Sequence, residues 1–297
     1  KNGGYTNMAN NINYATQYKK ELDQALVQNM LTAMLEVPAV NWLDAKSFHI
    51  PTISVTGFKT HSRNGGYNRG SVEKTDKPYT IEFDRDIEFF IDEADVMESN
   101  RVAEMGNITR VFIESQATPE IDAYRFSKLA TLAGVKTAEA LPAQPADVLK
   151  RVKEDIGKAR KHGVSNLVVY VSSDVMNAIE SARLGMGKVD LLNQGTAIET
   201  RVTVLDGVQL VEVYDADRFM TKYDFTEGFK PAVDAKGINW IVVAKPAVVA
   251  VAKIQSVKLF LNGEHSQGDG ALYQNRMLHD LFVLENKKDG VIVSTQA

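Results

Sequence analysis

The chain of 297 residues has no cysteine, which excludes disulfides, thiolate metal ligands and a cysteine nucleophile. It also lacks a basic excess: 34 Lys and Arg residues stand against 38 Asp and Glu residues, a formal net charge of −4. Because sequence-independent nucleic-acid binding needs a basic surface, nucleic acid is not the obvious ligand. No run approaches the roughly 20 consecutive apolar residues of a membrane-spanning helix, so we expect no membrane partner.

Catalytic and metal-binding motifs are equally scarce. The five histidines are scattered without the short spacings that bring ligands to one metal ion, so we expect no metal and no cofactor. A Gly-x-Ser-x-Gly nucleophile motif does not occur, and Ser173 and Asp174 are better explained by a helix cap. His279 and Asp280 are adjacent on a predicted strand, where side chains point to opposite faces, which favours an edge or interface role. We therefore expect no enzyme activity.

The chain does contain 44% hydrophobic and 24% charged residues, as folded globular proteins do. Residues 1–40 are polar at first and then weakly amphipathic, which is typical of an arm rather than a domain. Residues 48–55 are rich in β-branched and aromatic side chains, and residues 78–87 alternate polar and apolar, so together they predict a long hairpin. Their connection, residues 57–77, far exceeds an ordinary hairpin loop, and therefore is either disordered or in contact with a partner.

Helical spacing of apolar residues follows between residues 92 and 132. At Thr118-Pro119-Glu120 either a second helix begins, with Thr118 as its cap, or one long helix is kinked. Just beyond, Asp122 and Arg125 have the spacing of an ion pair within a helix.

An alternation of helix and strand follows. Residues 148–159 predict an amphipathic helix, and residues 167–171 predict a strand buried on both faces, followed by a helix that Ser173 caps. Residues 202–213 predict a hairpin with Asp-Gly in a type I′ turn. Further strands are expected at 241–244, 248–254 and 281–284.

Two neighbouring segments have opposite charge. Residues 57–77 contain five basic and two acidic residues, whereas residues 82–104 contain nine acidic and two basic residues. Solvated faces would explain both, but beside a long loop we favour complementary patches between subunits. The candidate contact residues are Lys59, Arg63, Arg69, Lys74 and Lys77 on one side and Glu82, Asp84, Asp86, Asp92 and Glu93 on the other.

The order of these parts resembles the major capsid proteins of tailed bacteriophages with the Hong Kong 97-like coat fold, especially those of siphophages of Gram-positive hosts. The resemblance is carried by Tyr79–Asp86 leading into Ile91–Asp95, by Pro119–Lys128, and by His279–Leu284 followed by Asn286–Gly290. It implies an α+β fold with five parts. These are an N-terminal arm at 1–47, an E-loop at 48–91, a P-domain with a long spine helix at 92–145, an A-domain at 146–265 and strands returning to the body at 266–297.

The same resemblance implies a structural protein, a major capsid subunit that self-assembles through pentamers and hexamers into an icosahedral head shell. The shell would enclose double-stranded phage DNA without sequence-specific contacts. Because the arm leaves no room for a scaffolding segment, we expect a separate scaffolding protein, together with a portal. Assembly in the host cytoplasm and a final location in the virion are implied as well.

Two alternatives stay open on the sequence. An encapsulin-like nanocompartment would share the fold but enclose a cargo enzyme. A cytoplasmic α/β enzyme would use Ser173 and Asp174 at a strand end together with His279.

Overall fold

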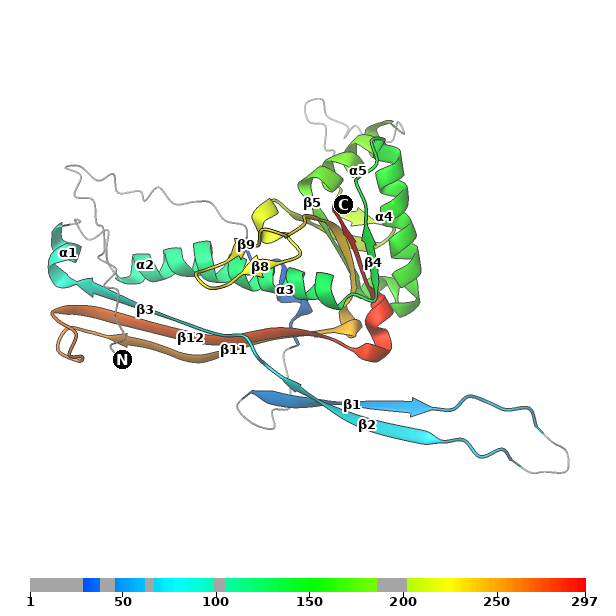
Figure 1. Ribbon diagram of the computed structural model, residues 1–297, viewed down its shortest axis with the longest axis horizontal. Coiled ribbons are helices and arrows are strands. Elements are labelled where there is room, and N and C mark those ends of the chain that lie inside the picture. Colours follow the sequence, from blue (N-terminus) through cyan, green and yellow to red (C-terminus); the bar gives the residue numbers. More distant parts are fainter. Residues whose placement is uncertain (1–28, 38–45, 62–66, 99–104, 186–201) are drawn as a thin grey trace, which may run out of the picture.

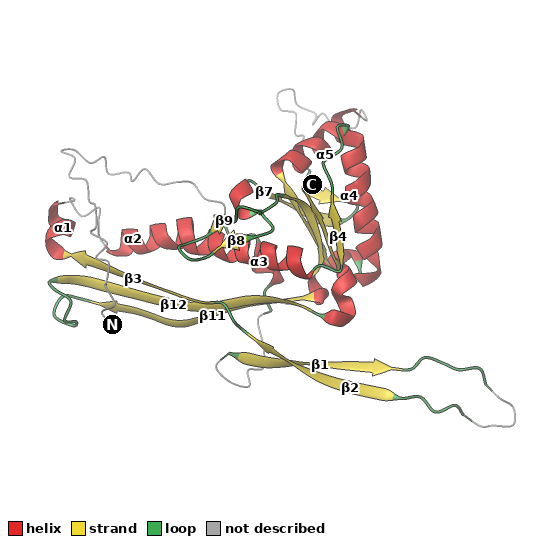
Figure 2. Ribbon diagram, in the orientation of Figure 1, coloured by secondary structure: helices red, strands yellow, loops and turns green. Residues whose placement is uncertain are grey.

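The computed structural model of the chain describes residues 29–37, 46–61, 67–98, 105–185 and 202–297. Its α-helices are α1 (Glu93–Glu98), α2 (Met105–Phe112), α3 (Thr118–Leu132), α4 (Pro145–Ala159) and α5 (Ser173–Gly185). Its strands are β1 (Ser47–Val55), β2 (Val72–Thr80), β3 (Asp84–Asp92), β4 (Val135–Ala138), β5 (Leu167–Ser172), β6 (Val204–Leu205), β7 (Val208–Val213), β8 (Tyr223–Asp224), β9 (Lys230–Pro231), β10 (Ile238–Ala244), β11 (Val248–Phe260), β12 (Gly270–Val283) and β13 (Val291–Thr295). The expected α+β class is confirmed (Figure 2).

A six-stranded mixed sheet forms one end of the molecule, in the order β4-β13-β10-β5-β7-β6 (Figure 1). The central strands β5 and β10 are mostly apolar and buried on both faces, as predicted for residues 167–171. Helices α4 and α5 lie side by side against this sheet, and α3 contacts it through Phe126, whose ring packs on Tyr170 and Phe219. The main hydrophobic core of the molecule lies here.

A three-stranded antiparallel sheet, β11-β12-β3, forms the long axis of the molecule beside α2 and α3 (Figure 1). The two helices are continuous through a π-helical segment at Ile113–Ala117, and Thr118 has α-helical backbone angles. Of the two alternatives at Thr118-Pro119-Glu120, one long irregular helix is therefore correct, and Thr118 does not cap a new one. Pro119 is tolerated because the π turn already rearranges the hydrogen bonds at this point.

The hairpin contains β1 and β2, and the second strand predicted for it, residues 78–87, is wrong. Ser47 pairs with Thr80 and Val55 with Val72, so the second strand begins at residue 72 rather than 78. Residues 84–92 form β3, which pairs with β12 and not with β1. Because β2 is exposed over most of its length, its sequence shows little of the apolar alternation that marks a half-buried strand.

Other local predictions can be compared directly. The helix at 148–159 is confirmed as α4, and the Asp-Gly turn between β6 and β7 has positive φ at Asp206 (52°) and Gly207 (81°). The cap of α5 lies one residue earlier than predicted, because the Ser172 hydroxyl accepts from the Val175 amide. Ser173 instead donates to the Val213 carbonyl.

Candidate functional site

The β1–β2 hairpin projects from the body of the molecule, and its far end consists of exposed side chains (Figure 1). Beyond the strand ladder the two segments stay together through hydrogen bonds, such as Thr56 N to Ser71 O at 3.1 Å. Phe58 and Tyr67 lie in this part, and both rings are almost completely exposed. Large exposed aromatic side chains are typical of surfaces that bind a partner.

Four of the five predicted basic contact residues lie on this hairpin with exposed side chains: Lys59, Arg69, Lys74 and Lys77. Arg63 lies outside the described residues. The Lys59 ammonium donates to the Arg69 carbonyl at 3.4 Å, which joins the two sides of the loop. Lys77 forms an exposed ion pair with Glu285 of the same chain at 3.4 Å.

Among the five predicted acidic contact residues, Asp84 at the start of β3 already has partners within the chain. Its carboxylate accepts from Arg276 Nη2 at 2.6 Å and from Lys46 Nζ at 2.9 Å. These two hydrogen bonds, Arg276 first, hold the pKa of the Asp84 carboxyl well below its usual range. Asp84 therefore stabilises the contact between β3 and β12 rather than offering a free charge.

Of the other four acidic residues, Glu82 precedes β3, Asp86 and Asp92 lie on it, and Glu93 begins α1. Asp92 accepts from the Ala94 amide at 2.8 Å and so caps α1, and Glu93 accepts from Asn262 at 3.0 Å. Glu82 and Asp86 have exposed side chains. The contact of this acidic strand with the basic hairpin of another molecule stays a prediction.

A cavity of about 530 Å³ lies between the π turn of the long helix and the strands β3 and β12. Arg85 closes one side, because its guanidinium pairs with Glu120 at 2.7 Å and donates to the Phe225 carbonyl at 2.6 Å. The floor is apolar, with Phe89, Phe112 and Met277. The sequence does not reveal this cavity, because its residues come from segments far apart in the chain.

His279 and Asp280 are buried, so the predicted edge or interface role is wrong for the described chain. Tyr124 contacts both: its hydroxyl donates to Asp280 at 2.9 Å, and its ring lies 5.2 Å from the His279 ring. Burial lowers the pKa of His279 to about 3, and the positive charges of Arg125 and Arg85 act in the same direction. His279 is therefore a neutral core residue.

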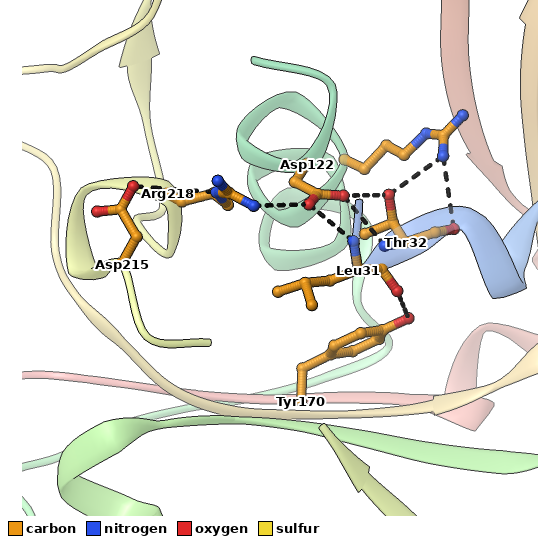
Figure 3. Close-up of polar contacts among 7 residues, drawn as sticks. Leu31, Thr32, Asp122, Tyr170, Asp215 and Arg218 are labelled. Carbon is orange, nitrogen blue, oxygen red and sulfur yellow. Dashed lines mark hydrogen bonds and ion pairs between the residues drawn. The ribbon is translucent and has the colours of Figure 1, made fainter. Parts of the chain in front are cut away.

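Residues 31–36, in the later part of the predicted N-terminal arm, are part of the core (Figure 3). Leu31 N, Thr32 N and the Thr32 hydroxyl all donate to the buried Asp122 carboxylate, at 2.9, 3.0 and 2.6 Å. Arg218 pairs with the same carboxylate at 3.3 Å, and the Tyr170 hydroxyl donates to the Leu31 carbonyl. Burial raises the Asp122 pKa, whereas these donors favour its charged form.

Two expectations are corrected by this cluster. Asp122 does not pair with Arg125; Arg125 instead pairs with Glu36 at 2.7 Å and donates to Thr32. Residues 31–36 belong to the fold of the molecule, although the sequence assigns them to an arm rather than to a domain. The amphipathic pattern predicted before residue 29 lies outside the described residues.

The residues of the alternative enzyme hypothesis are not brought together. Ser173 donates to Val213 in the six-stranded sheet, whereas His279 packs on Phe83 and Tyr124 beside the three-stranded sheet. Within the described ranges, no three His, Asp or Glu side chains are grouped to hold a metal ion. None of the described helices is long and apolar enough to cross a membrane.

We compared this arrangement with known proteins. No family model and no curated protein matches the sequence. The mature capsid structure of bacteriophage PhiM1 superimposes with a TM-score of 0.69 at 11% identity, over 95% of this chain and 92% of that one. The capsid structure of cyanophage P-SCSP1u gives 0.67 at 13% identity, over 96% and 93%. A structure from Mycobacterium phage Che8 gives 0.59 at 15% identity, over 96% and 97%.

At these sequence identities the structural likeness establishes the fold and not the function. It extends over more than nine tenths of both chains in each of these comparisons. The chain has the Hong Kong 97-like fold of tailed-phage capsid proteins.

Proposed function

We propose that the chain is the major capsid subunit of a tailed bacteriophage and forms the icosahedral shell of the head. The observation that carries the proposal is the match over more than nine tenths of both chains to phage capsid structures. The projecting hairpin supports it, because a two-stranded ribbon with exposed side chains gains stability from a neighbouring molecule. Pentamers and hexamers, a separate scaffolding protein, a portal, assembly in the host cytoplasm and packaged DNA without sequence-specific contacts belong to the same proposal.

Within this shell, the basic hairpin of one subunit contacts the acidic strand of a neighbour. We place four of the exposed predicted residues in this contact: Lys59 and Arg69 at the far end of the hairpin, and Glu82 and Asp86 on the neighbour. Each exposed pair contributes only about 0.2–1 kcal/mol, but the contact repeats at every interface. Salt at physiological ionic strength screens such pairs over roughly 8 Å, so this contribution weakens as salt is raised.

Assembly of the purified chain tests the proposal. We expect uniform closed shells by electron microscopy and a sedimentation coefficient far above that of a monomer, with a scaffolding protein supplied if the chain alone stays monomeric. Small discrete oligomers under both conditions would contradict a capsid role.

Charge reversal tests the electrostatic contact separately. Lys59→Glu with Arg69→Glu should impair assembly at low salt, and Asp86→Lys with Glu82→Lys in the same chain should partly restore it. Lys150→Glu with Lys153→Glu on α4 is a matched control of equal charge change. Normal assembly of the hairpin variant would show that these charges form only a solvated surface.

We propose a phage shell rather than the encapsulin-like nanocompartment, because the two structures above with TM-scores over 0.65 are phage capsids. A nanocompartment would co-purify with a stoichiometric cargo protein from its native cell. Mass spectrometry of native particles distinguishes cargo protein from DNA and portal.

A further inference from the structure

The cavity beside the long helix has the size and chemistry of a binding site. Its volume of about 530 Å³ lies within the range of 300–1,000 Å³ that is usual for ligand pockets. One wall is the π turn, a helix irregularity that is frequent at functional sites. The apolar residues that line the cavity are Ile87, Phe89, Phe112, Ala117, Ile121 and Met277.

The charged groups of the cavity favour a cationic occupant. Four carboxylates and one guanidinium line it. Asp84 pairs with Arg276 and Lys46, and Glu120 pairs with Arg85, so those two charges are matched. Asp86 is exposed, and Glu227 meets Lys230 only at 3.8 Å on a strongly exposed surface. The outer part of the cavity therefore remains acidic.

The hairpin of the same chain has the complementary chemistry. Phe58 is fully exposed, with a relative accessibility of 110%. It is followed by Lys59, whose ammonium group donates to the Arg69 carbonyl, so this end of the hairpin carries an exposed apolar ring and two exposed cationic residues. The other exposed ring of this loop, Tyr67, already contacts His61, with ring centres 6.2 Å apart. Phe58 is therefore the better anchor.

The hairpin cannot fill the cavity of its own chain. Strands β1 and β2 extend away from the three-stranded sheet and from the π turn between α2 and α3 (Figure 1). If this hairpin fills such a cavity, the cavity belongs to a second copy of the chain.

We propose that Phe58 of one subunit inserts into the cavity of a second copy, with Lys59 and Arg69 against Asp86 and Glu227. The inference rests on the proposed function and deepens it, because it names one aromatic anchor and its pocket. Anchors of this kind, an aromatic ring in a pocket surrounded by polar contacts, dominate the affinity of many interfaces.

Cross-linking between two single-cysteine chains tests the contact, because the natural chain contains no cysteine. Gly57→Cys places a thiol beside the anchor, where a Cβ atom meets nothing within 4 Å, and Gln116→Cys places one at the cavity. The two chains are assembled together and treated with a short bis-maleimide. We expect a covalent dimer of unlike chains. Glu114→Cys, exposed on the same π turn but outside the cavity lining, is the matched control and should cross-link at least fivefold less.

Phe58→Ala, added to the Gly57→Cys chain, should reduce this cross-link at least fivefold, whereas Tyr67→Ala should reduce it less than twofold. Shells that form without the Gly57–Gln116 cross-link, or with equal cross-linking at Glu114, would overturn this inference and leave the capsid role intact. An equal loss from Phe58→Ala and Tyr67→Ala would overturn the choice of Phe58 as the anchor. Failure of the parent chain to assemble would overturn both proposals.

Discussion

Asp122 is the residue on which the contact between the N-terminal segment and the rest of the molecule depends. Its carboxylate accepts from Leu31, Thr32 and Arg218, and all three of its neighbours lie on segments that are distant from α3 in sequence. A protonated carboxyl group would lose part of these bonds, because the two backbone amides and Arg218 can only donate. The ionised form is therefore the one that satisfies this site.

Asp122→Asn should destabilise the subunit by about 3–5 kcal/mol, because it removes the nearer and fully buried carboxylate of the two that pair with the buried Arg218 guanidinium; the other, Asp215, lies 3.9 Å away and is partly exposed. Urea unfolding of the unassembled chain measures the change. Glu114→Gln, an exposed acid on the same long helix, is the control and should change stability by less than about 0.5 kcal/mol. A loss below about 1 kcal/mol for Asp122→Asn would contradict the importance of this cluster.

His279 contributes a pH dependence to stability. Its folded pKa of about 3 lies below the ordinary value of 6.5, so the folded chain keeps it neutral while the unfolded chain takes up a proton. The contribution of His279 to the free energy of unfolding should therefore be fully present above about pH 6.5 and should be lost as the pH is lowered toward 3.

His279→Gln should remove one proton from the uptake that accompanies unfolding between pH 4 and 6. The free energy of unfolding as a function of pH, measured by urea titration, gives this proton number directly. His265→Gln is the comparison, since His265 is half-buried in a turn. An unchanged slope in the His279 variant would show that this residue is charged in the folded chain.

At the scale of elements, buried periodicity was predictable and exposed strands were not. The buried strand β5 and the amphipathic helix α4 follow from their apolar patterns. Strand β2 has the sequence Val-Glu-Lys-Thr-Asp-Lys at its start and is largely exposed, so no pattern marks it. Hydrophobic periodicity indicates burial, so it does not detect an exposed two-stranded ribbon such as the far end of the hairpin.

The features of the candidate site were also predictable only in part. The charge of the hairpin is a property of neighbouring residues and was visible in the sequence. The N-terminal cluster joins Thr32 to Asp122 across 90 positions, and the cavity joins β3, the π turn and β12. Contacts of this kind depend on the fold, so the spacing of Asp122 and Arg125 suggested a local pair where the structure has two distant ones.

The pairing of β3 with β12 can be tested at Gly270. A Cβ atom there would lie 2.1 Å from the Ile91 carbonyl oxygen, which is backbone and cannot rotate away. Gly270→Ala should therefore destabilise the chain by about 2 kcal/mol or more. Gly157→Ala in α4 meets nothing within 4 Å and should instead stabilise it by up to about 1 kcal/mol. Thermal unfolding compares both variants, and a neutral Gly270→Ala would mean that the strands can separate locally.

At the scale of the whole molecule, folding and assembly use different parts of the chain. The main core surrounds the six-stranded sheet, and a small second cluster, with Phe48, Ile81 and Leu278, fixes the base of the hairpin. The far end of the hairpin adds exposed aromatic and basic side chains and little buried surface. Its removal should therefore affect contacts between subunits more than the stability of one subunit.

Replacement of residues 56–71 by Asn-Gly tests this separation. Val55 and Val72 are the last pair of the β1–β2 ladder, and a type I′ turn of two residues closes an antiparallel pair with the right twist. We expect the shortened chain to unfold at the same urea concentration as the parent, because the clusters that hold the fold are intact. It should nevertheless form no closed shells by electron microscopy, since Phe58, Lys59 and Arg69 are absent. Normal shells from this variant would show that the hairpin end is dispensable, whereas loss of the folded subunit would show that it supports the fold.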